Sequence, residues 1–566
     1  MAFDLIIKGG QVLDGTGQAG YTADIGISDG QIREIGRLKS RSRHTVDADG
    51  AIVTPGFVDI HTHYDGQATW ASRMSPSSNH GVTTAVMGNC GVGFAPVRPE
   101  DHEMLVQLME GVEEIPGAAL HEGLPWTWES FPDYLDYLAT RHYDMDIGAQ
   151  LPHAALRVYV MGARGANREP ATAQDIAAMR RLVAEAMRAG AIGFSSSRTL
   201  NHRSSTGAPT PSLTAERAEL LGIADGIRDA GRGVLEMISD FTELDTEFDN
   251  VEAMAERAGC ALSVSLAQGL SPNGWHKVMA RIERANAKGT VIRGQVAPRA
   301  IGILTGLTNT TNPFFTRPSY MEVAKLPVPE RLVALRDPAR KARILAEAPS
   351  KGYERLFRLM AGGWKLWEVT ATPDYEPVPE DSMAARAERE GVETWSYVYD
   401  RLIAGDGLVM FYTPFANYAD GNLECCREML LHENTVPGLG DGGAHVGTIC
   451  DASFSTTLLA HWGRDRRRGE RIDLPLLVKR QTQDTARAVN LTDRGVLACG
   501  LRADINVIDF PNLRVLAPEM VRDLPAGGAR MQQRASGYVY TLVNGEITYH
   551  NGVATDALPG RLVRGQ

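Results

Sequence analysis

Residues 54–67 read TPGFVDIHTHYDGQ, and this stretch decides the predicted fold. Pro55-Gly56 opens a short apolar strand that ends in His61-x-His63. Because side chains at positions i and i+2 of a strand face the same way, the two imidazoles project together and can bind one cation. The carboxyl end of a strand is where barrel enzymes have their active sites, so we interpret the pair as metal ligands rather than as structural histidines.

Downstream of this strand, amphipathic helices alternate with short apolar strands. Residues 172–190 have helical periodicity, and residues 191–197, AIGFSSS, are typical of the strand that follows a helix. Further units of this kind end in GVLEMIS, CALSVSLA and TVIRGQV. So many βα units without a dinucleotide-binding glycine motif predict an α/β fold, a closed (β/α)8 TIM barrel rather than an open sheet.

Both ends of the chain predict antiparallel sheet. Residues 3–57 consist of short β-rich segments between glycine turns, and residues 493–510 and 537–553 repeat this pattern. We therefore expect one small β-sandwich built from both termini. The predicted domains are a composite β-sandwich of residues 1–57 and 486–566 and a TIM-barrel catalytic domain of residues 58–485.

Residues 306–395 interrupt the alternation with prolines and charged helices, as in NPFFTRPSYMEVAKLPVPERL. We interpret them as an insertion within the barrel. Two roles stay open for it, a lid over the barrel mouth and a surface elaboration without a part in catalysis.

The composition excludes some classes of partner. The 69 acidic and 58 basic residues give a formal charge of −11, which offers no footprint for nucleic acid or for an anionic membrane. No apolar run approaches the roughly 18–20 residues of a bilayer span, and the first residues lack the features of a signal peptide. The six cysteines include no C-x-x-C pair, so a disulfide framework is not indicated. We expect a cytoplasmic protein with a small-molecule partner; the oligomeric state, homo-oligomer included, stays open.

A second chemical signal lies late in the chain, in TVPGLGDGGAHVGTICD. It places Asp441 between glycines at the end of a predicted eighth strand. A carboxylate there can bind the cation, take a proton from water that the cation activates, and pass it to a leaving nitrogen. Asp-Gly-Gly also occurs in plain turns, but its order after the histidine pair favours the catalytic interpretation. Valine at Gly440 or Gly442 should damage activity, because we expect both positions to need backbone freedom.

Taken together, PGFVDIHTH, GDGGAH, ADINVIDF and LVNGEITYHNG resemble the amidohydrolase superfamily over nearly the whole chain. Within it, GVTTAVMGNCGVGFAPVRP, LMEGVEEIPG, LPHAALRVYVMG and AIGFSSSR resemble the N-acyl-D-amino-acid deacylase (D-aminoacylase) branch, and NCG-x-G-x-AP is the most specific of these. The resemblance implies that Cys90 is a metal ligand, where other branches use a carboxylated lysine or a glutamate. A thiolate beside a divalent cation is reasonable because the metal lowers the thiol pKa. The alternative is a small buried residue.

The sequence departs from this branch at two further ligand positions. D-aminoacylases carry histidines on strands five and six, whereas the corresponding segments here, GVLEMISD and ALSVSLAQ, contain none. Glu236 or Asp240 could take the first position, but Leu266 at the second cannot coordinate a metal.

These observations favour a site with a single metal ion. The expected ligands are His61, His63, Asp441 and Cys90, with Zn2+ as the favoured ion and other divalent metals open. One Lewis-acidic ion can both activate water and polarise a carbonyl, so the site need not be inert.

Five more polar side chains follow predicted strands and are candidates for substrate binding, since a guanidinium suits a substrate carboxylate. They are His153, Arg157, Arg198, His202 and His445. For each, a helix cap, a salt bridge or a surface position is an equal alternative.

The predicted function is metal-dependent hydrolysis of a C–N bond other than a peptide bond. By resemblance the substrate is an N-acyl amino acid or a related amide. A cyclic amide or a lactone is a second possibility, since the same attack by water serves either carbonyl. A non-catalytic scaffold or binding protein is a third; the missing histidines support it, and the four retained ligand candidates oppose it.

Overall fold

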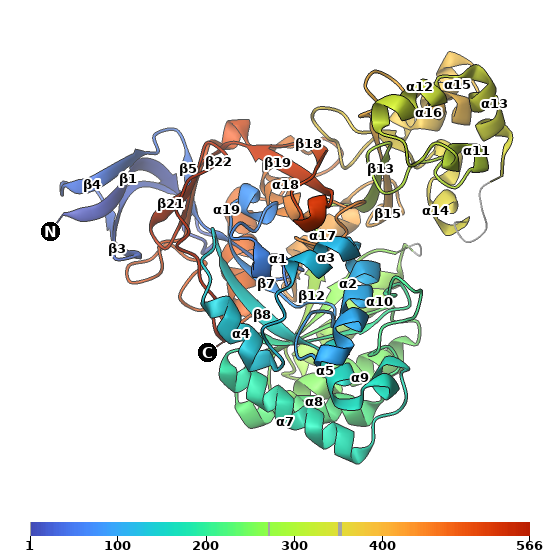
Figure 1. The fold of residues 1–566 in the computed structure, drawn as a ribbon. Coiled ribbons are helices and arrows are strands. Elements are labelled where there is room, and N and C mark those ends of the chain that lie inside the picture. Colours follow the sequence, from blue (N-terminus) through green and yellow to red (C-terminus); the bar gives the residue numbers. More distant parts are fainter. Residues whose placement is uncertain (1, 270–271, 349–353, 566) are drawn as a thin grey trace.

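A computed structural model of the protein describes residues 2–269, 272–348 and 354–565. Eight parallel strands form one sheet in chain order, and helices cover its outside (Figure 1). The strands are β6 (Phe57–Asp59), β7 (Val82–Met87), β8 (Asp146–Pro152), β9 (Gly193–Arg198), β10 (Val234–Ser239), β11 (Leu262–Leu266), β12 (Ile292–Val296) and β16 (Thr435–Pro437).

The segments that follow β6 and β16 join and close the sheet. Thr62 and Gly442 form a parallel bridge. His63 N donates to Gly442 O at 2.7 Å, and Asp441 N donates to His61 O at 2.9 Å. The predicted TIM barrel is confirmed, and its closing seam contains the histidine pair and the late aspartate.

The outer helices follow from local sequence, as α7 (Ala173–Ala189) shows. Thr172 and Asp175 form a capping box at its start, and Gly190, with φ of 106°, ends it. Buried Met179, Val183 and Met187, four residues apart, face the sheet. The other principal outer helices are α5 (His153–Met161), α8 (Arg217–Ala230), α9 (Leu244–Ala258), α10 (Gly274–Ala287) and α17 (Glu424–Leu431).

Strands from both chain ends share a nine-stranded sheet, in the order β22-β21-β20-β17-β5-β1-β2-β3, with β4 paired to β1. Because β17 lies between β5 and β20, the two termini interleave, which confirms that one β structure is built from both ends. Its strands are β1 (Phe3–Val12), β2 (Tyr21–Ser28), β3 (Gln31–Gly36), β4 (Ser42–Asp47), β5 (Ile52–Pro55), β17 (Ile505–Ile508), β20 (Tyr538–Val543), β21 (Glu546–His550) and β22 (Val553–Ala554).

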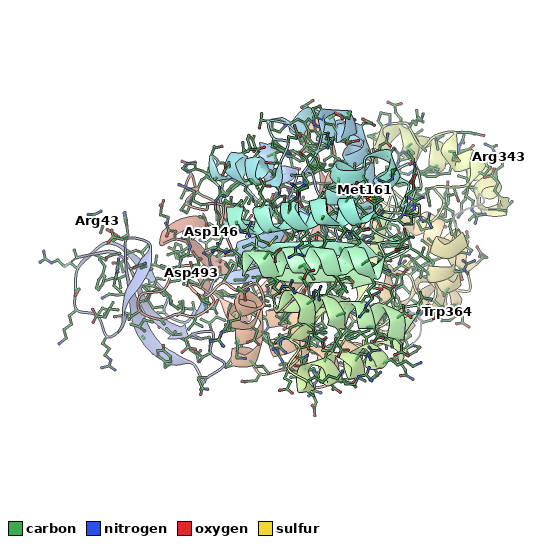
Figure 2. All side chains as sticks on the ribbon, turned by 90° about the horizontal axis from the view of Figure 1, so that it is seen from below. Arg43, Asp146, Met161, Arg343, Trp364 and Asp493 are labelled. Atoms are coloured by element: carbon green, nitrogen blue, oxygen red, sulfur yellow. The ribbon has the colours of Figure 1, made fainter. Side chains whose placement is uncertain are left out.

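Between β12 and β16 the chain forms a separate helical unit with its own apolar core, which extends from Leu307 to Phe411. The unit extends to one side of the barrel in Figure 1. Figure 2 shows Arg343 and Trp364, which belong to it, at the opposite end of the molecule from Arg43 of the nine-stranded sheet. Within the predicted insertion 306–395, residues 349–353 lie outside the described part of the chain. The elements of the helical unit are α11 (Pro318–Met321), α12 (Val328–Leu335), α13 (Pro338–Ala346), α14 (Glu354–Leu359), α15 (Met383–Glu390) and α16 (Thr394–Leu402), with β13 (Ile301–Gly306), β14 (Trp367–Glu368) and β15 (Met410–Ala416) at its base.

A hairpin of β18 (Arg514–Val521) and β19 (Arg530–Ser536) packs near the loop that follows β16, where α18 (Phe454–Ala460) begins. Among the described residues, none of the helices is at once long enough and apolar enough to pass through a bilayer.

Candidate metal centre

His61 is buried at the carboxyl end of the first barrel strand, with 1% of its surface exposed. Its Nδ1 lies 2.8 Å from Oε1 of Gln295, a residue of β12. When Nδ1–H donates a hydrogen bond to that amide oxygen, the proton stays on Nδ1 and Nε2 carries the free lone pair. The Nε2 atom is the one that faces Cys90 and Asp441.

His63 faces a carboxylate, although its Nδ1 makes no hydrogen bond to any described residue. Its Nδ1 lies 3.2 Å from Oε1 of Glu113, the last residue of α2 (His102–Glu113). Its Nε2 lies 3.7 Å from Asp441 Oδ1. Burial lowers the pKa of His63 to about 4 against the opposing effect of Asp441, so the ring is neutral near pH 7 and can act as a ligand.

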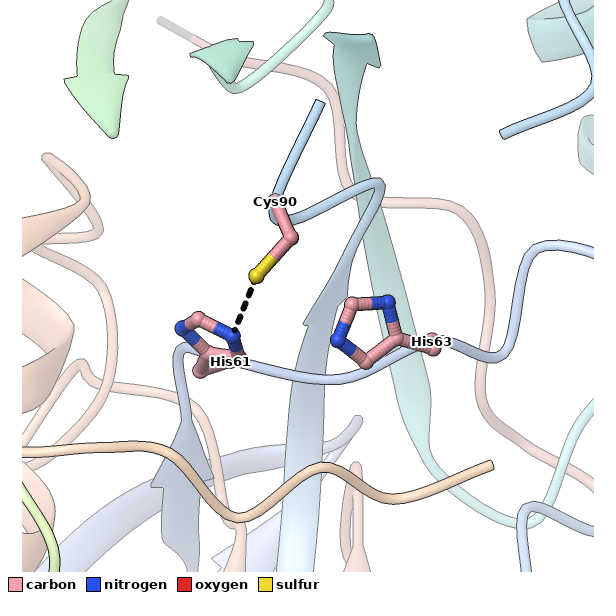
Figure 3. A group of neighbouring side chains, drawn as sticks. All are labelled: His61, His63 and Cys90. Carbon is pink, nitrogen blue, oxygen red and sulfur yellow. Dashed lines mark hydrogen bonds between the residues drawn. The ribbon is translucent and has the colours of Figure 1, made fainter. Parts of the chain in front are cut away.

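Cys90 follows β7 and points its thiol at the histidine pair, as Figure 3 shows. Sγ lies 3.3 Å from His61 Nε2, and the ligand atoms of Cys90, His61 and His63 all lie within 4.8 Å of one another. The backbone N of Cys90 donates to Glu236 Oε2 at 2.9 Å. Burial raises the pKa of the thiol, and the nearby carboxylates raise it further, so a bound cation would have to displace the thiol proton.

Asp441 completes the cluster from the loop after the eighth strand. Its Oδ1 lies 3.3 Å from His61 Nε2. Burial raises the pKa of Asp441, but the neighbouring imidazoles of His63 and His61 outweigh burial and hold the pKa well below its usual value. The carboxylate is therefore ionised and available to a cation or a proton.

Three residues of this region have left-handed backbone conformations. The φ angles are 54° for Cys90, 47° for Asp441 and 49° for His445. Such conformations cost non-glycine residues roughly 1–3 kcal/mol each and persist where the surrounding structure holds them. Their concentration around one cluster indicates a functional site.

The donor set fits a divalent cation. Two imidazoles, a cysteine sulfur and a carboxylate are the ligand types that zinc takes in tetrahedral sites. In the described residues, Glu236 Oε1 and Glu113 Oε2 are buried without hydrogen-bond partners, and buried oxygens of this kind are acceptors that a nearby cation stabilises. Burial raises the pKa of Glu236 to about 7.

The positions of the missing histidines remain without a nitrogen ligand. Leu266, on strand six, is 2% exposed and has no donor atom. On strand five, Glu236 reaches the Cys90 backbone, whereas Asp240 accepts a hydrogen bond from Thr199 and turns away. Glu236 is thus the strand-five residue that lies against the cluster.

Two of the five substrate-binding candidates are not brought to the cluster. His153 is fully buried, with Nδ1 on Ser196 Oγ at 2.8 Å and Nε2 on Glu219 Oε1 at 2.9 Å. Arg157 Nε also donates to Glu219, at 2.7 Å, and its remaining nitrogens donate to backbone carbonyls. Because their polar atoms are occupied by protein groups, we do not retain them as substrate-binding residues.

Of the other three candidates, Arg198 is paired with Glu247 at 2.6 Å and is not retained either. His202 and His445 lie beside the cluster. Burial, together with the nearby His445 and His63, lowers the pKa of His202 to about 3. His445 Nε2 lies 3.8 Å from Glu113 Oε2.

Glu113 and Gln295 are not among the site residues predicted from the sequence. Glu113 lies within LMEGVEEIPG, a segment that the resemblance had already marked, and Gln295 lies near the end of the seventh strand. The carboxyl ends of barrel strands are where active-site residues occur, so the position of Gln295 was a usable signal.

The model of the amidohydrolase family matches residues 44–549. The chain belongs to the amidohydrolase family. It is 27% identical to the N-acyl-D-glutamate deacylase of Alcaligenes xylosoxydans xylosoxydans, over 99% of this chain and 96% of that protein. A D-aminoacylase of the same organism is 38% identical over a region that covers 34% of this chain and 37% of that protein. The predicted resemblance to the D-aminoacylase branch is confirmed.

A solved structure agrees with this amidohydrolase assignment at the level of the fold. The N-acyl-D-glutamate deacylase of Bordetella bronchiseptica, solved with zinc and a phosphonate inhibitor, superposes with a TM-score of 0.62 at 24% identity. The match covers all of both chains.

Proposed function

We propose that this amidohydrolase uses a divalent metal to hydrolyse the C–N bond of an N-acyl amino acid. The observation that carries the proposal is the convergence of His61, His63, Cys90 and Asp441 at the carboxyl end of the barrel. The names of the relatives, a D-aminoacylase and an N-acyl-D-glutamate deacylase, support the substrate class and suggest the D configuration.

We propose one zinc ion, held by His61, His63, Cys90 and Asp441. When bound, such an ion supplies Lewis acidity, which polarises the substrate carbonyl and makes water more acidic. The absence of a nitrogen ligand from strand six supports a single ion.

Asp441 moves the proton in this mechanism. Its ionised carboxylate accepts a proton from the attacking water as the water oxygen bonds to the carbonyl carbon. The same carboxyl then gives that proton to the amide nitrogen as the C–N bond breaks, which leaves a carboxylic acid and an amine. Gln295 keeps the imidazole of His61 oriented through a hydrogen bond, the carboxylate of Glu113 lies 3.2 Å from Nδ1 of His63, and His202 and His445 contact the substrate.

We also propose the domain organisation and the location of the protein that the sequence predicts. Residues 1–57 and 486–566 form the composite domain and residues 58–485 the catalytic domain, with residues 306–395 inserted. The substrate is a small molecule, and the protein acts in the cytoplasm.

The test combines metal analysis with turnover. The zinc-loaded full-length protein is assayed for amine release from N-acetyl amino acids of both configurations. We expect about one zinc per chain, loss of zinc in His61→Ala, and a fall in kcat of about 10²–10⁴-fold in Asp441→Asn. Asp406→Asn, which removes an exposed carboxylate of the helical unit between β12 and β16, is the matched control and should keep both properties.

Two results would contradict the proposal. Native protein that binds no zinc would support the scaffold alternative, and turnover that survives Asp441→Asn would remove the assigned base. Two tightly held zinc ions per chain would overturn the single-ion part alone.

A further inference from the structure

His202 follows the fourth barrel strand, in the segment that leads from β9 to α8. Its Nδ1 lies 3.0 Å from Oγ of Ser197, a residue of β9. Thr210 N donates to His202 O at 3.3 Å and closes the base of the loop. The imidazole is thus tied to the end of the strand.

Two close backbone contacts place this loop against the metal centre. A Cβ at Gly91, the residue after Cys90, would lie 2.9 Å from Ser197 N. A Cβ at Gly111 of α2 would lie 2.1 Å from the backbone C of Ser204. The first contact joins the anchor of the imidazole to the turn that carries the proposed thiol ligand, and the second joins the loop to helix α2.

Helix α2 also reaches the centre itself. Glu113, two residues after Gly111, has Oε1 3.2 Å from His63 Nδ1 and Oε2 3.8 Å from His445 Nε2. Burial, with the nearby His445 and His63, lowers the pKa of His202, which agrees with this placement and keeps the ring neutral near pH 7. His202 therefore lies between α2 and the turn after β7, at the rim of the centre.

The hydrogen bond to Ser197 assigns the proton of the neutral ring. Ser197 is fully buried, and among the described residues the one partner of its Oγ is His202 Nδ1. A hydroxyl proton buried without an acceptor is costly, so Oγ donates to Nδ1. The ring proton is then on Nε2, which makes that nitrogen a hydrogen-bond donor.

This Nε2 donor is open and unused. It makes no hydrogen bond with any described residue, and it is not among the unpartnered polar atoms that burial closes to water. The side chain as a whole is partly exposed. A small molecule at the rim of the centre can therefore reach Nε2.

The amide and guanidinium groups at the neighbouring strand ends already donate to protein oxygens. They are Asn89, Gln150, Arg198, Gln295 and Arg299. His445 Nε2 faces the carboxylate of Glu113. His202 is thus the candidate whose N–H is not committed to the protein.

The proposed chemistry needs such a donor. As water attacks the carbonyl carbon, negative charge collects on the carbonyl oxygen. Catalytic zinc sites generally take three protein ligands and keep a position open, whereas four side chains converge here. Because coordination space on one ion is then short, an N–H group from the protein is the direct way to stabilise that oxygen.

We propose that His202 is a catalytic residue whose Nε2–H donates a hydrogen bond to the carbonyl oxygen of the amide as that oxygen becomes negative. No proton leaves the ring, since Asp441 takes the proton of the water and returns it to the amine. The inference rests on the proposed function and adds the residue that stabilises the oxygen.

The simpler alternative is that His202 only ties its loop to β9. Both interpretations predict some loss of stability when the ring is replaced. Only the catalytic role predicts that turnover and the binding of a tetrahedral analogue fall together while substrate binding is retained.

The experiment therefore compares turnover with the affinity for a phosphonate analogue of the tetrahedral adduct. The zinc-loaded full-length enzyme is assayed at about pH 7.5 for kcat and KM on its best N-acetyl amino acid, and the Kd of the matching methylphosphonyl amino acid is measured by calorimetry. His202→Asn keeps an oxygen near the position of Nδ1 for Ser197 and removes Nε2. We expect kcat to fall by about 10²–10³-fold and the phosphonate Kd to rise by a similar factor, with KM and zinc affinity changed by less than about threefold.

Two more variants test the geometry. His202→Gln carries an amide N–H to about the reach of Nε2 and should recover at least about tenfold of the lost kcat. Ser197→Ala removes the acceptor-side anchor, so it should lower kcat by about three- to tenfold alone and add nothing to His202→Asn.

His44→Ala is the control, because it removes an exposed histidine of β4 in the nine-stranded sheet. It should keep the wild-type kcat and phosphonate Kd. Thermal unfolding reports whether each variant is folded.

The outcomes separate the inference from the proposed function. Wild-type kcat and phosphonate Kd in His202→Asn overturn the catalytic role and leave the proposed function intact, as does a rise in KM with kcat unchanged. A parallel loss of zinc affinity also overturns it, since the ring would then act on the metal centre. If the wild type hydrolyses none of the amides, the proposed function fails and the inference fails with it.

Discussion

The carboxylate of Glu113 lies behind the imidazole of His63, with Oε1 3.2 Å from Nδ1. Glu113 is 1% exposed, and its other oxygen lies 3.8 Å from His445 Nε2. A carboxylate behind a ligand imidazole fixes the ring orientation and increases the basicity of the opposite nitrogen. Glu113 therefore links the proposed ligand His63 to a histidine at the edge of the site.

Glu113→Gln should weaken metal binding while it preserves the shape of the side chain. The neutral amide loses the charge that strengthens His63 as a ligand, so we expect zinc affinity to fall by about 10–100-fold. Competition with a coloured chelator measures this affinity without reference to activity. Glu114→Gln, which neutralises the exposed neighbouring carboxylate, is the control, and equal affinities in the two variants would contradict this role of Glu113.

Cys90→Ser should change how zinc affinity depends on pH. Burial and nearby carboxylates raise the pKa of the thiol, so zinc binding has to release its proton near neutral pH. A plot of log Kd against pH for the wild type should be steeper than that of the serine variant by about one unit per pH unit. Identical slopes would show that the thiol does not bind the metal.

The fold was accessible from the sequence because its signals are local. The His61-x-His63 strand, the βα alternation and the glycine-rich ends each follow from periodicity within short windows. The interleaving of β17 between β5 and β20 needed the structure, since strand order in an antiparallel sheet is set by long-range packing.

The site was only partly predictable from the sequence, because some of its contacts join residues far apart in the chain. The His-x-His spacing supplies two ligand candidates, but Glu113 approaches His63 from the end of a helix fifty positions later. His153 was a candidate because of its position after a strand, yet Glu219, 66 residues away, occupies its ring. A sequence pattern places a residue near the site and does not reveal which partner occupies it.

Gly440→Ala should impair both the folding and the turnover of the enzyme. The sequence predicts a need for backbone freedom at Gly440 and Gly442, but neither residue has a positive φ. The requirement is space, because a Cβ at Gly440 would lie 2.4 Å from Asp59 Oδ2 and one at Gly442 2.4 Å from Ser77 Oγ. The added methyl should displace the Asp441 loop and lower kcat/KM by at least about tenfold.

Gly269→Ala is the matched control for this crowding. Its Cβ would meet no atom within 4 Å, and its φ is not in the left-handed region. Activity and thermal midpoint should therefore stay near wild type. If Gly440→Ala behaves like the control, the Asp441 loop is more tolerant than the contacts indicate.

Glu376→Gln should reduce stability most at neutral pH and least in acid. Burial raises the pKa of Glu376, but His461, Arg466 and the Leu423 N–H lower it more, to about 2. The usual carboxyl value of 4.5 applies to the unfolded chain, so this group's contribution is fully present above pH 4.5 and is lost as the pH falls toward 2. Breaking the buried pair with Arg466 should cost on the order of 3–5 kcal/mol near pH 7.

Urea unfolding between pH 7 and pH 3 measures this pH dependence. The free energy of unfolding should fall less steeply toward acid in Glu376→Gln than in the wild type. Glu424→Gln removes the second partner of Arg466, which is 44% exposed, and should follow the wild-type curve. Parallel curves for Glu376→Gln and the wild type would mean that this carboxyl has the same pKa in the folded and unfolded chains.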